Sequence, residues 1–179
     1  REYLTIEELN KLVITDCHNP LLKRAALFSA LTGLRFSDIQ KMTWSELEYI
    51  NEQGYSLNFT QKKTNGVEVL PISDQAYSFT EGTNDPKNMP KDKQVFEGLK
   101  YSAYQNKHLF QWIGAAGITK HITFHCFRHT FASLLLFYGF DIYTVKKMLT
   151  QTDLKSTQVY AKVNDKSKRA AANIIKLDL

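Results

Sequence analysis

Residues 124–136, FHCFRHTFASLLL, carry three polar side chains at the head of an otherwise apolar segment. In an α-helix, positions i, i+3 and i+4 share one face, and His125, Arg128 and His129 have this spacing. The adjoining positions have the spacing of a helix packed on a core. They are Phe127, Phe131, Leu134, Leu135 and Tyr138. The segment therefore predicts a helix that is anchored by one side and carries positive charge on the next.

Helical patterns fill most of the remaining chain. Thr5 and Glu8 have the spacing of a capping box that opens a first helix. A second helix is predicted after Pro20, ending at Gly33, because glycine suits the left-handed position that follows a helix. A short third helix is expected from about Ser37 through the letters DIQKMTW. Further helices are expected from near Gly98 onward, with breaks at Gly114, Gly117, Gly139 and the TQTD stretch.

One stretch has the period of a β-strand. Residues 55–61, YSLNFTQ, alternate apolar and polar side chains, and Asn65-Gly66 is a strong two-residue hairpin signal before VEVLPI. With Asn65 and Gly66 as the central turn residues, Lys63 would pair opposite Glu68. The predicted fold class is therefore mainly α with a small β-hairpin (α+β), and the loop over residues 82–93 is expected to be exposed.

Length and composition favour one globular domain. The chain has 179 residues, of which 43% are hydrophobic and 23% charged. No apolar run approaches the roughly 18 residues of a membrane span. Cys17 and Cys126 lie far apart, which predicts neither a disulfide framework nor a metal site. We expect a cytoplasmic protein without metal or cofactor.

The positive charge is unevenly placed. Residues 1–54 hold 6 Lys and Arg against 8 Asp and Glu, so the later residues hold 17 of the 23 basic and 10 of the 18 acidic side chains. The net charge of +5 therefore arises entirely after residue 54. Such asymmetry indicates an anionic partner, most often nucleic acid.

Five short stretches are unusual for a plain helical domain. They are TGLRFSD (32–38), QKKTNGVEVLPI (61–72), HCFRH (125–129), LTQ (149–151) and STQVYAKV (156–163). In this order and at these separations, they resemble the catalytic domain of tyrosine recombinases, the phage integrase family, and they are similar to the integrases of bacterial mobile elements. The resemblance covers nearly the whole chain. It implies the fold of the DNA breaking and rejoining enzymes and a single catalytic domain over residues 1–179.

The resemblance implies a phosphate site. Arg35 and Arg128 would grip the scissile phosphate, since guanidinium forks bind its nonbridging oxygens and stabilise the charge that develops there. His125 would act as general acid or base, with His129 as the extra histidine that often follows the motif. Asp38, three residues after Arg35, would orient that guanidinium.

The resemblance also implies a nucleophile and a leaving-group acid. Tyr160 would attack phosphorus, forming a 3′-phosphotyrosine and a 5′-hydroxyl, and rejoining would need neither metal nor ATP. Lys63 lies eight residues before Pro71, where the family places the lysine that protonates the leaving oxygen. Thr150-Gln151 stand where the family usually carries Gly-His or Gly-Trp. A glutamine amide can donate a hydrogen bond but cannot exchange a proton near neutral pH.

The function implied is site-specific recombination or integration of double-stranded DNA at the bacterial nucleoid. Family members act as tetramers and often exchange C-terminal helices between subunits. The apolar strip AAANIIKL (170–177) is compatible with such an exchange and equally with docking on its own subunit. Family members usually also carry an N-terminal DNA-binding domain that this chain lacks, so we expect a fragment. Three alternatives remain: a type IB topoisomerase that relaxes supercoils, a noncatalytic DNA-binding module, and a basic domain that binds acidic proteins. Gln151 in place of the usual residue supports the noncatalytic module.

Overall fold

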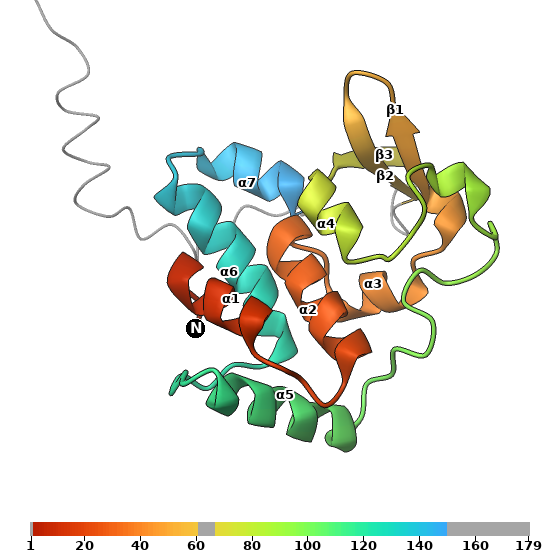
Figure 1. Ribbon diagram of the computed structural model, residues 1–179. Helices are drawn as coiled ribbons and strands as arrows, with labels where there is room; N and C mark the ends of the chain where they lie inside the picture. The colour runs from red at the N-terminus through yellow and green to blue at the C-terminus, as the bar shows by residue number, and fades with distance from the viewer. Residues whose placement is uncertain (1, 61–66, 150–179) are drawn as a thin grey trace, which may run out of the picture. The chain divides into compact units, whose positions relative to one another are not determined.

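The computed structural model describes residues 2–60 and 67–149 (Figure 1). The chain divides into two compact units, Arg1–Phe131 and Ala132–Leu179. The elements are α1 (Ile6–Ile14), α2 (Pro20–Thr32), α3 (Phe36–Lys41), η1 (Trp44–Glu46), β1 (Leu47–Ile50), β2 (Gly54–Thr60), β3 (Val67–Pro71), α4 (Asp74–Ser78), η2 (Pro86–Asn88), α5 (Ala103–Ala115), α6 (Phe124–Phe137) and α7 (Ile142–Met148). The single domain over residues 1–179 stays a prediction.

The helix ends follow the local sequence signals. The hydroxyl of Thr5 accepts from the Glu8 N–H at 3.2 Å, and the Glu8 carboxylate accepts from the Thr5 N–H at 2.8 Å, which confirms the capping box of α1. The Asn19 side chain caps α2 by accepting from the Leu22 N–H at 3.0 Å. Gly33 ends α2 with φ of +73°, as predicted. These contacts satisfy N–H groups that a helix leaves without internal partners.

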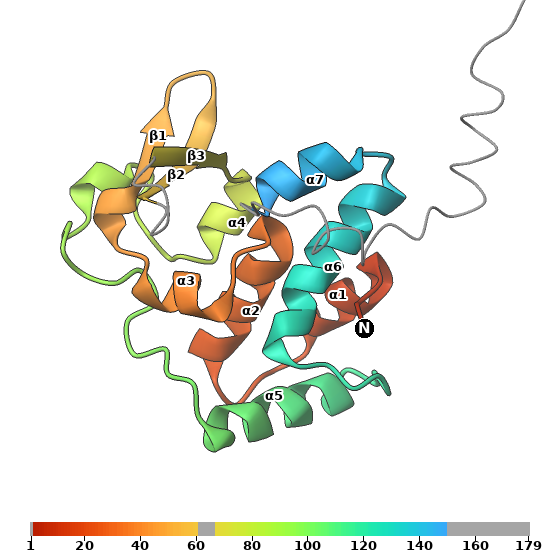
Figure 2. The same cartoon turned by 180° about the vertical axis from the view of Figure 1, so that it is seen from behind.

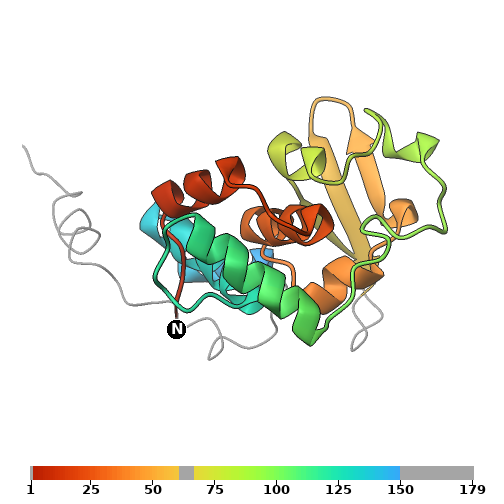
Figure 3. The same cartoon turned by 60° about the horizontal axis from the view of Figure 1, so that its bottom comes forward.

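Helix α2 forms the centre of the first unit. It lies between α1 and α3, as the opposite views in Figures 1 and 2 show. Its side chains are buried around much of the circumference, and small residues such as Ala25 and Ala26 let the neighbouring elements approach closely. Helix α5 runs along the lower side of the unit and comes forward in Figure 3. It is tied to α1 because Trp112 donates from Nε1 to the carbonyls of Leu12 and Thr15, at 3.3 and 3.1 Å.

The sheet has three strands, where the sequence predicted a two-stranded hairpin. Its order is β1-β2-β3, and both pairs are antiparallel. The additional strand, β1, pairs Leu47 with Leu57 and Ile50 with Gly54. The expected third helix extends over only the first letters of DIQKMTW, since α3 ends at Lys41. The chain then forms η1 and turns into β1.

The predicted hairpin register is wrong. Glu68 pairs with Phe59 rather than with Lys63, and six residues, 61–66, separate the paired residues Thr60 and Val67. Burial explains the register, because the paired side chains of Leu57 and Leu70 are both 3% exposed. A two-residue turn at positions 65 and 66 would break this pair, and buried side chains set strand register more strongly than a turn signal.

The predicted loop of residues 82–93 is mostly exposed, and two tyrosines hold its first part. The rings of Tyr55 and Tyr77 stack at 3.7 Å. Their hydroxyls donate to the carbonyls of Asn84 and Thr83, at 2.9 and 2.6 Å. The pKa of Tyr77 is raised to about 12, mainly because its hydroxyl is buried and secondly because of the neighbouring Tyr55. Tyr77 is therefore a packed structural residue.

Replacing Gly82 by alanine should destabilise the fold. A Cβ atom at Gly82 would lie 2.6 Å from the Tyr77 hydroxyl and 2.7 Å from the Trp44 ring. Overpacking of this kind typically costs about 1–3 kcal/mol of unfolding free energy. Gly114→Ala in α5 is the matched control, since nothing lies within 4 Å of its added Cβ, and helical alanine should stabilise. Chemical denaturation measures both variants; equal midpoints for wild type and Gly82→Ala would contradict the close packing.

The second unit continues α6 and adds α7. Asp141 caps α7 by accepting from the N–H groups of Tyr143 and Thr144. Hydrogen bonds from the Thr144 side chain and main chain hold the pKa of Asp141 below its usual value. The prediction that Tyr138 packs inward is wrong: its side chain is 60% exposed, and it follows the last residue of α6, Phe137, which is exposed as well. Within residues 2–60 and 67–149, no helix combines the length and apolar character that crossing a membrane requires.

Candidate active site

Arg35 is presented by a tightly fastened turn. Gly33 reverses the chain after α2, and Arg35 then takes the extended N-cap position of α3. Two buried hydroxyls of α2 hold the connecting residue Leu34: Ser29 donates to its carbonyl at 2.8 Å, and Thr32 accepts from its N–H at 3.3 Å. The Arg35 side chain itself is exposed. A rigid main chain thus carries a solvent-facing guanidinium.

Asp38 acts on Arg35 through the main chain. One carboxylate oxygen of Asp38 accepts from the Arg35 N–H at 3.4 Å, which closes the first turn of α3. The contact fixes the backbone from which the Arg35 side chain leaves. Orientation of the guanidinium by the Asp38 carboxylate stays a prediction.

The start of α6 is anchored to the N-terminal segment. Thr130 accepts from the Leu4 N–H at 2.9 Å and donates to the Cys126 carbonyl at 2.8 Å, and both Thr130 and Leu4 are fully buried. Cys126 accepts from the Thr123 N–H at 3.4 Å, next to the first residue of α6. The helix that carries His125 and Arg128 is therefore held in the core of the first unit.

Thr130→Val should destabilise the protein, because the buried Leu4 N–H would lose its 2.9 Å partner. An unsatisfied buried donor costs about 1–3 kcal/mol. Thr130→Ser keeps the hydroxyl and loses one methyl group, so its loss should be near 0.8 kcal/mol, about the value of one buried CH₂. Urea unfolding of the two variants measures the difference. Equal losses would show that the hydrogen bond contributes nothing.

The polar groups of α6 differ in exposure. His125 is exposed, whereas Arg128 and His129 are 2% and 5% exposed. Arg128 is turned inward and donates from Nη1 to the Gly33 carbonyl. The rings of His125 and His129 meet edge to face at 4.5 Å. The predicted positively charged side of this helix is therefore mostly enclosed, with His125 at its surface.

One pocket of about 360 Å³ brings the candidate residues together. Arg35, His125 and Arg128 all line it, although α3, the sheet, α4 and α5 separate the first from the others in the chain. The Arg128 guanidinium also contacts the turn that carries Arg35, through Gly33. Positive charge thus converges on a single hollow, as a phosphate site requires.

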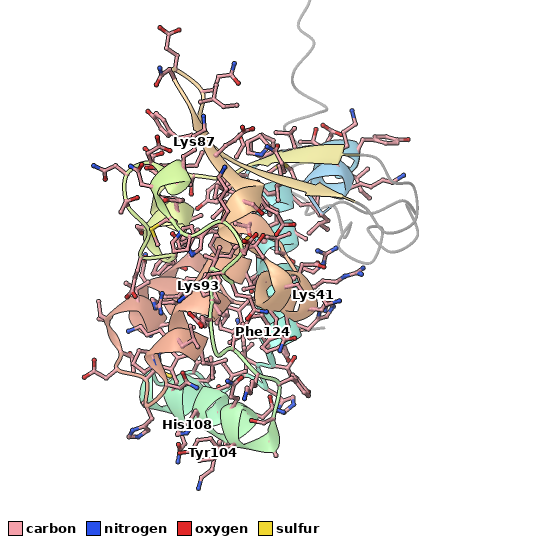
Figure 4. The ribbon with its side chains drawn as sticks, turned by 90° about the vertical axis from the view of Figure 1, so that its right-hand side faces the viewer. Lys41, Lys87, Lys93, Tyr104, His108 and Phe124 are labelled. Carbon is pink, nitrogen blue, oxygen red and sulfur yellow. The ribbon has the colours of Figure 1, made fainter. Side chains whose placement is uncertain are left out.

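Part of the lining of the pocket was not predicted. It includes Tyr101, Asn106 and Phe110, on and just before α5. Phe36 and Phe124 also line the pocket, and in Figure 4 Phe124 lies between α3 and α5. The sequence contained a signal for these two, because Phe36 directly follows Arg35 and Phe124 directly precedes His125.

Three predicted site residues lie outside the described part of the chain: Lys63, Gln151 and Tyr160. Strands β2 and β3 flank the segment that contains Lys63. Among the described residues, no cluster of three or more His, Cys, Asp or Glu side chains is placed to hold a metal ion. The described part of the site therefore consists of arginine and histidine groups at a pocket with aromatic walls.

Comparison with known proteins supports the resemblance. The profile of the phage integrase family matches residues 2–167. Tyrosine recombinase XerC of Mannheimia succiniciproducens is 25% identical over 170 residues, covering 90% of this chain and 56% of the relative. XerC of Rickettsia canadensis is 30% identical over 143 residues, covering 75% of this chain and 45% of the relative. The chain thus spans about half the length of the curated relatives it matches.

Solved structures agree with the fold. XerA recombinase superposes with a TM-score of 0.70 at 20% identity, over 99% of this chain and 65% of the other. The catalytic domain of bacteriophage HP1 integrase superposes with a TM-score of 0.67 at 22% identity, over 96% of this chain and 94% of the other. The predicted class, mainly α with a small sheet in the tyrosine recombinase catalytic fold, is confirmed. With a family match that extends over residues 2–167, this chain belongs to the phage integrase family.

Proposed function

We propose that this chain is the catalytic part of a site-specific tyrosine recombinase, an integrase, that cuts and rejoins double-stranded DNA. The observation that carries the proposal is the single pocket lined by Arg35, His125 and Arg128 in a member of the phage integrase family. Two guanidiniums and an imidazole at one hollow suit a phosphodiester that gains negative charge during the reaction.

The two arginines have different tasks. Arg128 is buried, and its guanidinium is held by the Gly33 carbonyl, so it forms the fixed, preorganised side of the phosphate clamp. Arg35 is exposed on a rigid turn and closes on the phosphate from the open side. A buried guanidinium acts in surroundings of low dielectric constant, where its interaction with developing charge is strongest.

The chemical step transfers one phosphoryl linkage. The Tyr160 hydroxyl attacks phosphorus, the P–O5′ bond breaks, and a 3′-phosphotyrosine and a 5′-hydroxyl strand end form. His125 takes the proton of the tyrosine, and Lys63 gives a proton to the leaving oxygen. Gln151 donates a hydrogen bond to the phosphate. Attack by the 5′-hydroxyl on the phosphotyrosine reverses each transfer and rejoins the strands without metal or ATP.

The partner is double-stranded DNA, and the assembly on DNA is a tetramer with the C-terminal residues exchanged between subunits. Two structural relatives are XerH recombinase bound to its difH substrate and the Tn1549 transposon integrase in complex with circular intermediate DNA. The basic excess after residue 54 supports contacts with the DNA backbone, which would make binding strongly salt-dependent. The nucleoid is the expected location, and a mobile element is the expected source.

Covalent capture of DNA tests the proposal. The substrate is a pool of nicked duplexes with randomised sequence around the nick. After cleavage, the short strand that ends in the 5′-hydroxyl dissociates, so rejoining is prevented and the enzyme stays attached to the 3′ phosphate. The proposal expects a DNA adduct that is stable in denaturant and is destroyed by protease. DNA binding without an adduct would instead favour the noncatalytic module. A plasmid relaxation assay and a paired-site recombination assay together distinguish a recombinase from a type IB topoisomerase. A topoisomerase would relax supercoiled plasmid without exchanging strands between the two sites.

A further inference from the structure

Three aromatic rings form a connected series along the pocket. Phe36 meets Tyr101 edge to face with ring centroids 5.6 Å apart, and it meets Phe124 edge to face at 4.9 Å. All three rings line the pocket that Arg35 and His125 also line. Phe124 is buried, Phe36 is half-buried, and Tyr101 is 71% exposed. The series therefore begins in the core and ends with a ring open to solvent.

The main chain is held in place on both sides of Tyr101. The Gln40 side chain donates to the Leu99 carbonyl at 2.9 Å, which ties the segment before Tyr101 to α3. Ser102 directly after it caps α5 by accepting from the Gln105 N–H at 3.1 Å. A fixed backbone, with the half-buried Phe36 ring packed against Tyr101, presents an exposed aromatic ring, which is the arrangement of a stacking platform.

The pocket is larger than a phosphate requires. Its volume of about 360 Å³ lies within the range of sites that take a small organic molecule, about 300–1,000 Å³. Its lining is cationic at Arg35 and Arg128, and it also includes the Tyr101 ring and the exposed Asn106 side chain. Cations, an aromatic face and an amide together fit a nucleotide, in which the phosphate is joined to a base.

We propose that Tyr101 stacks on the base next to the clamped phosphate and so positions that nucleotide for cleavage. The inference rests on the proposed function and adds a positioning residue to it. Stacking tolerates any base, since each base has a π-face. The site would therefore favour an unstacked nucleotide at the cleavage position without reading its sequence. The ring carries the contact, and the hydroxyl is dispensable.

The test measures the rate of covalent capture on nicked duplexes for wild type, Tyr101→Ala and Tyr101→Phe. Tyr101→Ala should be slower by about 5- to 150-fold, the range of base–aromatic stacking, whereas Tyr101→Phe should stay within about twofold of wild type. Tyr104→Ala is the matched control. Tyr104 is 68% exposed in α5, the helix that follows Tyr101, and packs against His108, at a distance from Phe124 in Figure 4. It should capture DNA at the wild-type rate.

A duplex with an abasic site beside the cleaved phosphate, placed on each side in turn, separates stacking from a structural role. With the contacted base missing, wild type should slow to the rate of Tyr101→Ala, and the substitution should cause no further loss. An equal loss on intact and abasic duplexes, or normal capture by Tyr101→Ala, overturns the inference and leaves the proposed function standing. No capture by wild type overturns both.

Discussion

Tyr160→Phe is expected to abolish covalent capture of DNA while DNA affinity stays within about twofold of wild type. The substitution removes only the hydroxyl that would form the phosphotyrosine bond, and a phenyl ring contains no nucleophile. Family resemblance alone assigns this role, because Tyr160 lies outside the described residues. The measurement is a gel assay for the adduct on nicked duplexes, beside a binding titration.

Tyr143→Phe is the control for Tyr160→Phe. Tyr143 is 62% exposed at the start of α7, so loss of its hydroxyl should change neither capture nor binding. Persistent capture by Tyr160→Phe, or loss of capture with Tyr143→Phe, would remove Tyr160 from the proposed mechanism. Mass spectrometry of the wild-type adduct would then identify the attached residue.

Arg128→Lys is expected to slow DNA cleavage by about 10²- to 10³-fold, the usual loss when one preorganised donor to the transition state is removed. Arg128 combines two contacts in the proposal, with the Gly33 carbonyl and with the phosphate. The lysine ammonium is a compact group that cannot reproduce the planar fork of donors. Single-turnover cleavage of nicked duplexes gives the rate.

Lys120→Arg is a control for general effects of exchanging the two cations. Lys120 forms an ion pair with Glu8 at 2.7 Å and donates to the Tyr3 carbonyl at 3.1 Å. Lys120→Arg should cleave DNA within about twofold of the wild-type rate. Thermal unfolding should verify separately that Arg128→Lys is folded under assay conditions. A folded Arg128→Lys protein with normal cleavage would contradict the clamp.

Local sequence signals correctly predicted the start of α1 and the end of α2. The Thr5–Glu8 capping box and the left-handed Gly33 depend on neighbours within one turn, so their chemistry is readable from the chain alone. The spacing of His125 and Arg128 likewise placed both on one helix that lines the pocket. These are features in which a few adjacent residues decide the structure.

Features that depend on contacts between residues far apart in the chain could not be predicted from the sequence. Strand β1 and the true register follow from burial of Leu57 between Leu47 and Leu70, which lie on two other strands. The inward turn of Arg128 depends on the Gly33 carbonyl, 95 residues earlier. Tyr101 joins the pocket only because α3 and α6 bring Phe36 and Phe124 together. Sequence separation conceals such contacts.

The central claim is that Arg35 and Arg128 act on one phosphate, and a neutral substrate tests it most directly. A methylphosphonate at the cleaved position removes the charged oxygen that the arginines would bind. We predict that Arg35→Ala and Arg128→Ala each cleave the ordinary diester far more slowly than wild type. On the neutral linkage, the difference in cleavage rate between each variant and wild type should be smaller. In the double variant, the two losses of activation free energy should not be additive. The claim would be contradicted if each substitution reduced the cleavage rate by the same factor on both linkages and the two effects were additive in the double variant.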